Sequence, residues 1–430
     1  MPRAVLPSRV AISGMNGRRN DADMETKKIV REPARELPVF GEYDVIVAGG
    51  GVAGVAAALS AARAGARTLL LERQYLLGGL ATLGLVTIYL PLCDGRGHQV
   101  SFGVAEELLR LSVSHGAEVP LPRAWAESGN VEDRARARME VRYNANLFAC
   151  LAEKQLADAG VEILFGATLC DAVTEGGGLR YVIVENKSGR GALYARGFVD
   201  ATGDADLCAL AGEETAYFAQ GNVLAAWYYA TKGDKNALRM LGCADIPDKE
   251  KRESGKSGTA PLVDRRFGGF SAKELSEMVC LSHKIALSDF LAGGDLADGH
   301  ALTMLPTIPQ IRMTRRLSGQ YTMRDEEMHR RFSDSIGMIG DWRKSGPIYE
   351  LPFGILCGRR IGNLFAAGRC ISVEDAMWDI TRVIPACAVT GEAAGLAAAM
   401  TDGIHAPEVT ALQEKLYRAG GKLHIDEAVS

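Results

Sequence analysis

Near the start of the chain, two short apolar runs flank a longer segment of small, mostly apolar residues. Residues 44–48 form a short apolar run, residues 52–64 are small and mostly apolar, and residues 68–71 form a second apolar run. A short run, a longer small-residue segment and another short run are typical of a strand, a helix and a strand. The pattern predicts a βαβ unit with two parallel strands, and therefore an α/β fold.

Further along, the pattern predicts a β-meander and then a mixed region. Residues 168–200 contain three strand-like runs separated by glycine-bearing turns, which is typical of a meander. Residues 211–350 show few clean βα repeats, with a polar stretch at 245–268, and residues 117–140 are charged and irregular. Further helices are expected at 103–114, 144–159, 272–291 and 385–400, and a further strand at 161–165.

The turn between the first strand and the first helix is rich in glycine. Gly49, Gly51 and Gly54 fit the spacing G-x-G-x-x-G. In such a unit the first glycine permits a tight turn, the second lets the backbone approach a pyrophosphate, and the third lets helix and strand pack closely. The helix N-terminus adds unpaired N–H groups and the positive end of a dipole. The motif, in register with both strands, predicts a bound dinucleotide.

Glu72 closes the second strand, about 20 residues after the glycine motif, where a carboxylate accepts hydrogen bonds from an adenosine ribose. A carboxylate there repels a 2′-phosphate, so FAD or NAD is favoured over NADP. Arg73 beside it keeps NADP open, although a solvated arginine explains it as well. Two other interpretations are a βαβ turn without ligand and a membrane span. Glycines and Arg63 interrupt the apolar run, which argues against the span.

Composition narrows the class of protein. The chain has 430 residues, of which 47% are hydrophobic and 24% charged, as in an ordinary globular protein of two or three domains. Its net charge of −4 without a long basic run predicts no nucleic-acid partner. No membrane segment or secretory signal is recognised, so we expect a cytoplasmic protein without a membrane partner. Met15 and Met24 are alternative starts, and the first 26 residues are expected to be mobile. A homo-oligomer is left open.

The nine cysteines are odd in number, scattered, and without a C-x-x-C pair. This usage predicts reduced thiols, and neither a disulfide framework nor a zinc site. No other residue cluster has metal-ligand spacing, so we expect no metal.

Three glycine-bearing pieces, at 49–54, 201–204 and 366–369, are separated by unlike material. With Glu72-Arg73, Leu77-Gly78-Gly79, Ile308 to Arg312 and Asn363 to Ser372, they make the chain resemble the FAD-dependent oxidoreductase family, within the larger glutathione-reductase-like flavoprotein group. The resemblance covers roughly residues 30–402. It implies a Rossmann-like FAD-binding domain with a β-meander and an inserted α+β substrate or cap domain. The implied division is an N-terminal extension at 1–40, the discontinuous FAD-binding domain at 41–210 and 351–405, the substrate or cap domain at 211–350, and a C-terminal tail at 406–430.

The resemblance also implies which residues contact FAD. It assigns Gly49, Gly51 and Gly54 to the pyrophosphate, Glu72 to the adenosine ribose, Thr168 or Leu169 to the adenine, Thr202 and Gly203 to the vicinity of the pyrophosphate, Gly78, Gly79 and Thr82 to the ribityl chain or the flavin ring, and Gly368 and Arg369 to the ribityl chain and the flavin edge. Arg73 is also counted among the cofactor-binding residues. The helix that starts near Pro385 would direct its positive end at the flavin; a buried core helix is the alternative.

Arg312, Arg315 and Arg316 place three cations within five residues. If the segment is extended, Arg312 and Arg316 share one face and Arg315 takes the other; if it is helical, Arg312 groups with both. Arginine suits a carboxylate, a phosphate or the polar edge of a flavin. A solvated or salt-bridged surface is the alternative.

Arg382, just before the last predicted helix, is the second candidate for fixing a substrate anion. In this region the family commonly carries a Thr-His pair, whereas this chain has Val373, Glu374 and Asp375. A catalytic histidine is therefore not carried over. Glu374 or Asp375 is a candidate base, although helix N-capping is the favoured interpretation. His98, near the glycine-rich flavin loop, is a candidate base or covalent anchor, or a surface histidine.

These observations predict an FAD-dependent dehydrogenase or oxidase. A small polar organic substrate would give a hydride to the flavin, Arg312 and Arg382 would orient that substrate, and an external acceptor would reoxidise the flavin. A single G-x-G-x-x-G and no C-x-x-C argue against a disulfide reductase. The alternatives are a flavin hydroxylase fed by NAD(P)H and a non-redox dinucleotide-binding protein.

Overall fold

The computed structural model describes residues 30–127, 129–242, 261–294 and 299–429. The chain forms two compact units, Met1–Leu37 and Pro38–Ser430. In the first unit, the described residues 30–37 contain no helix or strand. The alternative starts, the expected mobile N-terminus and most of the polar stretch at 245–268 lie outside the described residues. The division into four domain-like parts stays a prediction.

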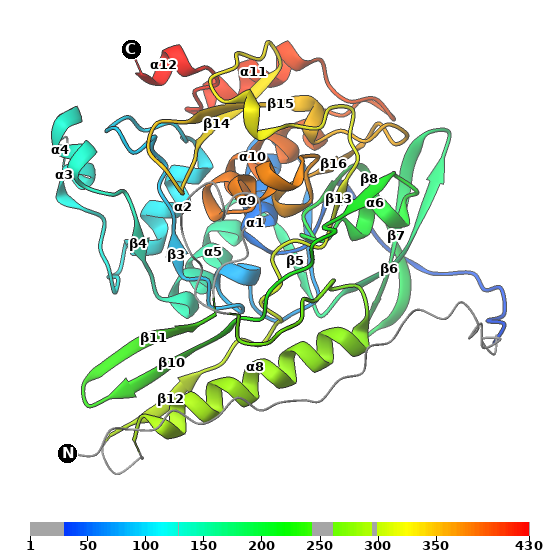
Figure 1. The fold of residues 1–430 in the computed structure, drawn as a ribbon. Coiled ribbons are helices and arrows are strands. Elements are labelled where there is room, and N and C mark those ends of the chain that lie inside the picture. The colour runs from blue at the N-terminus through cyan, green and yellow to red at the C-terminus, as the bar shows by residue number, and fades with distance from the viewer. Residues whose placement is uncertain (1–29, 128, 243–260, 295–298, 430) are drawn as a thin grey trace, which may run out of the picture. The chain divides into compact units, whose positions relative to one another are not determined.

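A seven-stranded sheet is the largest element of the second unit (Figure 1). Its order is β5-β2-β1-β8-β7-β6, and β16 also pairs with β8. β5, β2, β1, β8 and β16 are parallel, whereas β7 is antiparallel to β6 and to β8. The strands are β1 (Val39–Ala48), β2 (Thr68–Glu72), β5 (Glu162–Phe165), β6 (Thr168–Glu175), β7 (Gly178–Asn186), β8 (Gly189–Asp200) and β16 (Leu364–Ala366).

The parallel part of this sheet is buried on both faces. Every residue of β2 is buried, and so are the last four residues of β1, as expected for strands covered by other elements on both sides. β8 joins the two halves of the sheet. Its first half pairs with β7 of the meander, and its end, from Phe198, pairs with both β1 and β16. The predicted βαβ unit and meander are therefore confirmed.

Helices α1 (Val52–Arg63) and α10 (Ile384–Ala399) pack against each other and against β1 and β8. The contact is close because its residues are small. A Cβ atom on Gly391 would lie 2.2 Å from the carbonyl oxygen of Ala53, and one on Gly395 would lie 2.1 Å from that of Ala57. The last long helix is therefore fitted onto the helix of the glycine motif.

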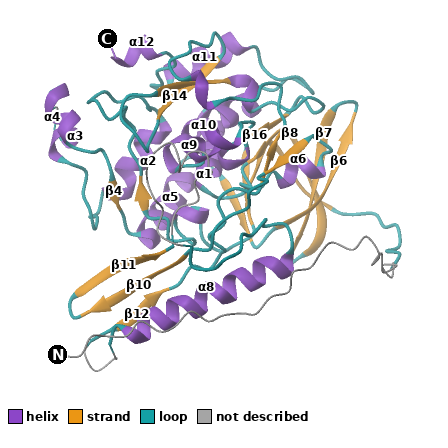
Figure 2. Ribbon diagram, in the orientation of Figure 1, coloured by secondary structure: helices purple, strands orange, loops and turns teal. Residues whose placement is uncertain are grey.

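A second region is built from a three-stranded sheet and one long helix (Figure 2). The sheet has the order β11-β10-β12, and α8 (Ala272–Ala292) lies along it. Alternate residues of β10 face opposite ways: Trp227 and Tyr229 cluster with Leu85 of the glycine-rich loop, whereas Tyr228 and Ala230 cluster with α8. The predicted α/β fold with an inserted α+β region is confirmed.

The irregular stretch predicted at 117–140 is partly wrong, because it contains the short helices α3 and α4. Asn130 caps α4 by accepting a hydrogen bond from the Asp133 N–H at 2.9 Å. Asparagine is a favoured N-cap residue, so this helix start could have been predicted despite the many charged residues.

The remaining elements are η1 (Gly79–Ala81), β3 (Ile88–Tyr89), α2 (Val104–Val113), α3 (Arg123–Ala126), α4 (Val131–Arg136), β4 (Val141–Arg142), α5 (Ala145–Asp158), α6 (Asp206–Leu210), β9 (Thr215–Tyr217), β10 (Ala226–Lys232), β11 (Lys235–Leu241), β12 (Ala301–Met304), β13 (Arg315–Leu317), η3 (Asp325–Glu327), β14 (Ser335–Gly340), β15 (Ile348–Pro352), η4 (Phe353–Ile355), η5 (Gly368–Cys370), α9 (Asp375–Thr381), α11 (Val409–Arg418) and α12 (Ile425–Val429).

Candidate cofactor and substrate site

One large cavity of about 730 Å³ connects the three glycine-bearing pieces with the inserted region. A volume of this size is typical of a small-molecule or cofactor site. The predicted site residues that line it are Gly49, Gly51, Glu72, Arg73, Gly78, Gly79, Thr168, Leu169, Thr202, Gly203, Arg312, Arg369 and Arg382. Residues from widely separated stretches of the chain thus line one cavity.

The three glycines of the motif differ in what surrounds them. Gly49 has φ +102°, and a Cβ atom there would lie 2.5 Å from the carbonyl oxygen of Ala201, so this turn requires glycine. A Cβ atom on Gly54 would lie 1.8 Å from the carbonyl oxygen of Gly49. A Cβ atom on Gly51 would meet nothing within 4 Å, although Gly51 lines the cavity. The fold itself needs two of the glycines, whereas the third leaves room for a ligand.

Glu72 is held at the cavity wall by two backbone N–H groups. Its Oε2 accepts a hydrogen bond from Gly50 N at 2.7 Å and its Oε1 accepts one from Gln74 N at 2.7 Å. The side chain is buried and lines the cavity beside Arg73, Thr168 and Leu169. Its carboxylate is therefore fixed in place before any ligand arrives.

The second and third glycine pieces lie beside the first. A Cβ atom on Gly49 would lie 2.5 Å from the carbonyl oxygen of Ala201, and one on Gly368 would lie 2.7 Å from the Cβ atom of Ala53. Gly203 packs against the guanidinium of Arg369. That guanidinium donates from Nη1 to the carbonyl oxygen of Arg312 at 2.9 Å. These contacts link the glycine turn to the arginine segment on the same cavity wall.

Three predicted cofactor residues do not line the cavity. Gly54 lies within α1 against the glycine turn. Thr82 is buried, and its Oγ1 donates to the carbonyl oxygen of Leu77 at 2.5 Å. Gly368 donates from its N–H to Thr390 Oγ1 at 3.0 Å. Each fixes the loop on which a cavity residue lies, and the contacts with a cofactor assigned to them stay predictions.

The arginine segment follows neither pattern that its sequence allowed. Arg312 and Arg315 line the cavity, whereas Arg316 forms an ion pair with Asp375 at 3.2 Å. The reason is an irregular backbone: Asn222 Oδ1 accepts hydrogen bonds from the N–H groups of Arg312 and Met313 at 3.1 and 2.9 Å. This side-chain cap interrupts the alternation that an extended segment would have.

Arg312 belongs to the end of the cavity formed by the glycine-rich loop. The segment before it follows that loop, because the Thr307 N–H donates to the carbonyl oxygen of Leu83 at 2.9 Å. The Arg312 side chain is buried, and its guanidinium carbon lies 5.0 Å from the ring centroid of Trp227. We use the name arginine end for the cavity-lining residues Arg312, Trp227 and Leu83 together with Arg382, Ile384 and Cys387.

Arg382 lines the same cavity at the junction of α9 and α10. Its Nη2 forms an ion pair with Asp379 one turn earlier. Val383 and Ile384, which open α10, also line the cavity, and a proline occupies the first turn of the helix. The N-terminal N–H groups of α10 therefore lie at the cavity, where they favour negative charge.

Titratable groups in the cavity wall are shifted by burial. Burial, followed by the neighbouring Asp204, raises the pKa of Asp206 to about 6, even though Arg315 lies 2.6 Å away. Burial also raises the pKa of the Cys387 thiol to about 11, against the opposing effect of Arg369 and Arg382. Cys387 is therefore protonated near neutral pH.

The other candidate bases are placed elsewhere. His98 Nδ1 lies 3.0 Å from Asp94 Oδ2, which fixes it in its own loop. Glu374 occupies the N-cap position of α9 without a side-chain capping bond and pairs with Arg324 at 3.1 Å, so the side-chain capping expected of it is wrong. Asp375 is engaged by Arg316. None of these three side chains lines the cavity among the described residues.

Sequence reasoning missed Trp227, Trp342, Asp204 and Asp206, which also line the cavity. The run Ala201 to Asp206 follows β8 directly, and acids after a parallel strand are a signal for the two aspartates. No pattern in the sequence indicates the tryptophans, because they reach the cavity from unrelated segments.

No helix in the described part of the chain has the length and apolar character needed to cross a membrane. Within the same residues, no group of His, Cys, Asp or Glu side chains is arranged to hold a metal ion. The cysteines that the structure describes are free; Cys243 lies outside the described residues.

Two curated proteins share parts of this sequence. The chain is 26% identical over 235 residues to the tRNA uridine 5-carboxymethylaminomethyl modification enzyme MnmG of Lactobacillus johnsonii, across 52% of this chain and 32% of that protein. It is 35% identical over 72 residues to thioredoxin reductase of Ureaplasma parvum, across 17% of this chain and 23% of that protein. The matches thus span a third or less of the length of these relatives.

Solved structures with a similar course of the chain include a geranylgeranyl bacteriochlorophyll reductase-like protein of Thermoplasma acidophilum, with 15% identity, TM-score 0.44, and coverage of 89% of this chain and 84% of that chain. Another is 3-ketosteroid-delta4-(5alpha)-dehydrogenase of Rhodococcus jostii RHA1, with 17% identity, TM-score 0.40, and coverage of 84% and 97%.

The family model described as FAD dependent oxidoreductase matches residues 44–251 and 286–415, which is most of the chain and includes all three glycine-bearing pieces. The prediction of an enzyme that uses FAD is confirmed. The chain belongs to the FAD dependent oxidoreductase family, and FAD is its cofactor.

Proposed function

We propose that this enzyme oxidises a small polar organic substrate by transfer of a hydride to FAD, and that an external acceptor reoxidises the cofactor. The observation that supports it is the continuity of one cavity from the glycine turn and Glu72 to Arg312 and Arg382. When bound, FAD supplies the two-electron chemistry. The protein supplies the binding, the orientation and the charge around it.

The glycine half of the cavity fits a dinucleotide. The open space at Gly51 leaves room for a pyrophosphate next to the N–H groups that begin α1. Glu72, already fixed by two backbone N–H groups, would accept hydrogen bonds from the adenosine ribose, with Thr168 and Leu169 beside the adenine. Arg369 would neutralise part of the pyrophosphate charge.

The arginine end would hold the substrate. Arg312 and Arg382 line the cavity with their side chains largely buried. A guanidinium away from bulk water binds a polar or anionic group more strongly than an exposed one does. Apolar neighbours such as Leu83 and Ile384 would exclude water from the reacting atoms. The inserted region, which contributes Trp227, would therefore act as the substrate part of the enzyme.

A second candidate function is oxidation of NAD(P)H, which would make the protein a hydroxylase or reductase of the flavin type. At the arginine end as defined above, the ionisable side chains are Arg312, Arg382 and Cys387, and the thiol is protonated near neutral pH. The cavity-lining residues Asp204 and Asp206 lie beside Arg315 instead. Hydride transfer from a reduced nicotinamide needs no general base, whereas oxidation of an alcohol does. Because these side chains include no general base, they favour a reduced nicotinamide over an alcohol as the hydride donor.

An anaerobic reduction screen separates these candidates. The FAD-loaded enzyme is mixed with hydroxy acids, sugars, amines, NADH and NADPH, and loss of flavin absorbance is followed. Bleaching by an organic substrate supports the first proposal, and bleaching by NAD(P)H alone supports the second. No bleaching by any donor, with FAD bound, contradicts both and supports a non-redox role.

A further inference from the structure

Asp379 is completely buried in α9, and it is not itself part of the cavity wall. Its Oδ1 pairs with Arg382 Nη2, and its Oδ2 lies 3.7 Å from Arg343 Nη1. Arg343 in turn binds both oxygens of Asp341, at 2.9 and 3.0 Å. A buried carboxylate is costly unless it is paired. Here both buried carboxylates are paired with guanidinium groups, and the exposed Lys344 ammonium also lies 3.9 Å from Asp341.

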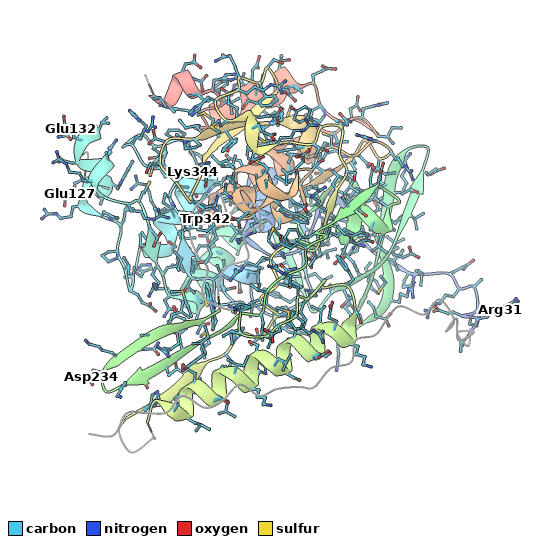
Figure 3. All side chains as sticks on the ribbon, viewed as in Figure 1. Arg31, Glu127, Glu132, Asp234, Trp342 and Lys344 are labelled. Atoms are coloured by element: carbon cyan, nitrogen blue, oxygen red, sulfur yellow. The ribbon has the colours of Figure 1, made fainter. Side chains whose placement is uncertain are left out.

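Asp379 also fixes a second residue of the cavity wall. Its carbonyl oxygen accepts a hydrogen bond from Trp342 Nε1 at 3.0 Å. Trp342 lies near the ribbon of α9 (Figure 3). Both residues that Asp379 binds, Arg382 and Trp342, line the cavity.

The two contacts come from different parts of one residue. The carboxylate of Asp379 fixes Arg382 within the last turn of α9, because the two residues are three apart. Its backbone carbonyl fixes Trp342, which belongs to the loop after β14. A planar guanidinium and a flat indole held in one place suit a planar anion, for which a carboxylate is the simplest case.

We propose that Asp379 is a positioning residue that orients Arg382 and Trp342 for the carboxylate group of a substrate. This inference rests on the proposed function, in which Arg382 binds the substrate. Asp379 acts through Arg382 and does not itself touch the substrate.

Binding of carboxylate probes to the FAD-loaded full-length chain tests the proposal without a known substrate. Benzoate and acetate are titrated and the change in flavin absorbance gives the Kd, with benzyl alcohol as the uncharged control. The variants are Asp379→Asn, Arg382→Ala, the double variant, and Asp341→Asn. Asp341 is the matched control, because it is a buried carboxylate of the same cluster that binds Arg343.

We expect the parent to bind benzoate and Asp379→Asn and Arg382→Ala each to weaken binding about tenfold or more. The double variant should be no weaker than Arg382→Ala, because both changes remove one interaction. Asp341→Asn should change the Kd by less than about threefold, and benzyl alcohol should not discriminate. FAD content and Tm of each variant show whether the fold is retained.

Other outcomes overturn the proposal at different levels. If Arg382→Ala weakens benzoate binding but Asp379→Asn behaves like Asp341→Asn, the positioning role is wrong and the proposed function stands. If the parent binds no carboxylate, or Arg382→Ala binds as the parent does, the anion role of Arg382 in the proposed function is wrong.

If Asp379→Asn does not fold, Trp342→Phe serves as the second variant. It keeps a ring and removes the N–H that binds the carbonyl of Asp379, so the benzoate Kd should rise about threefold. An unchanged Kd would contradict this part of the proposal.

Discussion

The two ends of the cavity are built in different ways. We call the part of the cavity lined by Gly49, Gly51 and Glu72 the glycine end. Its wall is mostly backbone, and even the Glu72 side chain is fixed by backbone N–H groups. At the arginine end the wall is side chains, such as Arg312 and Arg382, which arrive from separate segments. A backbone wall depends on local geometry, and in the proposed function it would bind FAD. A side-chain wall changes with single substitutions, and in the proposed function it would select the substrate.

The largest effect is expected from a substitution that tests whether the glycine turn is also needed for the stability of the fold. Gly54→Ala would place a Cβ atom 1.8 Å from the carbonyl oxygen of Gly49, so α1 must move away from β1. We expect a loss of more than about 4 kcal/mol in the free energy of unfolding. Denaturant unfolding and the yield of folded protein measure it. A stable Gly54→Ala protein would mean that the turn relaxes cheaply.

Helix α10 reaches the arginine end with its first turn and carries the buried Glu392 further along. Burial raises the pKa of Glu392 to about 7 from the ordinary value of 4.5, while the nearby Arg63 has a lowering effect. The protonated form is therefore favoured by folding. Its stabilising contribution is complete below pH of about 4.5 and is lost as the pH rises through about 7.

Glu392→Gln should remove this pH dependence. The glutamine oxygen can still accept the Val104 N–H, which Oε2 accepts at 2.9 Å in the parent. Above pH of about 8, the variant should be more stable by on the order of 3 kcal/mol, and the two proteins should converge at acidic pH. Tm against pH measures the difference, with Glu106→Gln on α2 as the control. A parent whose Tm does not fall between these limits would contradict the raised pKa.

Gly51→Ala separates cofactor binding from folding. An added Cβ atom meets nothing within 4 Å, so the apoprotein should keep its stability within about 0.5 kcal/mol. The methyl group would intrude on the space proposed for the pyrophosphate, and we expect FAD affinity to fall by about 2 kcal/mol, near thirtyfold. Isothermal titration of the apoprotein measures it. Unchanged FAD affinity would mean that the pyrophosphate does not bind beside Gly51.

The smallest change in FAD affinity is expected from a substitution at the arginine end. Arg312→Lys keeps the charge but loses the planar guanidinium over Trp227. FAD affinity should change less than about threefold, whereas reduction by an organic substrate should slow about tenfold. Stopped-flow reduction and FAD titration are the two measurements. If Arg312→Lys lowered FAD affinity as much as Gly51→Ala does, the two ends of the cavity would not differ in the way proposed.

The glycine end could be predicted because its residues are close in sequence. Gly49 to Glu72 form one βαβ unit, so spacing alone indicates which residues meet. The arginine end could not be predicted to the same depth. Arg316 turns away because Asn222, about 90 residues earlier, interrupts the backbone near Arg312. Trp342 reaches the cavity through a bond to the Asp379 carbonyl, which no repeat or spacing encodes.

Some local details were also beyond the sequence. Thr82 matched its motif, yet its hydroxyl binds the carbonyl of Leu77 within its own loop. A motif identifies the loop and does not decide which way a short side chain turns. Glu374 sits where a capping residue belongs, but the ion pair with Arg324 occupies its carboxylate.

The close fit of α10 onto α1 has a consequence for synthesis on the ribosome. The glycine turn and its helix emerge early, but Gly391 and Gly395 cover that helix only after nearly the whole chain has been translated. Until then the nascent chain exposes the small apolar surface of α1, and the end of β8 lacks its partner β16. Uncovered strand edges invite pairing with other chains. A product that stops short of residue 364 lacks both β16 and α10 and should therefore aggregate, however intact its dinucleotide motif is.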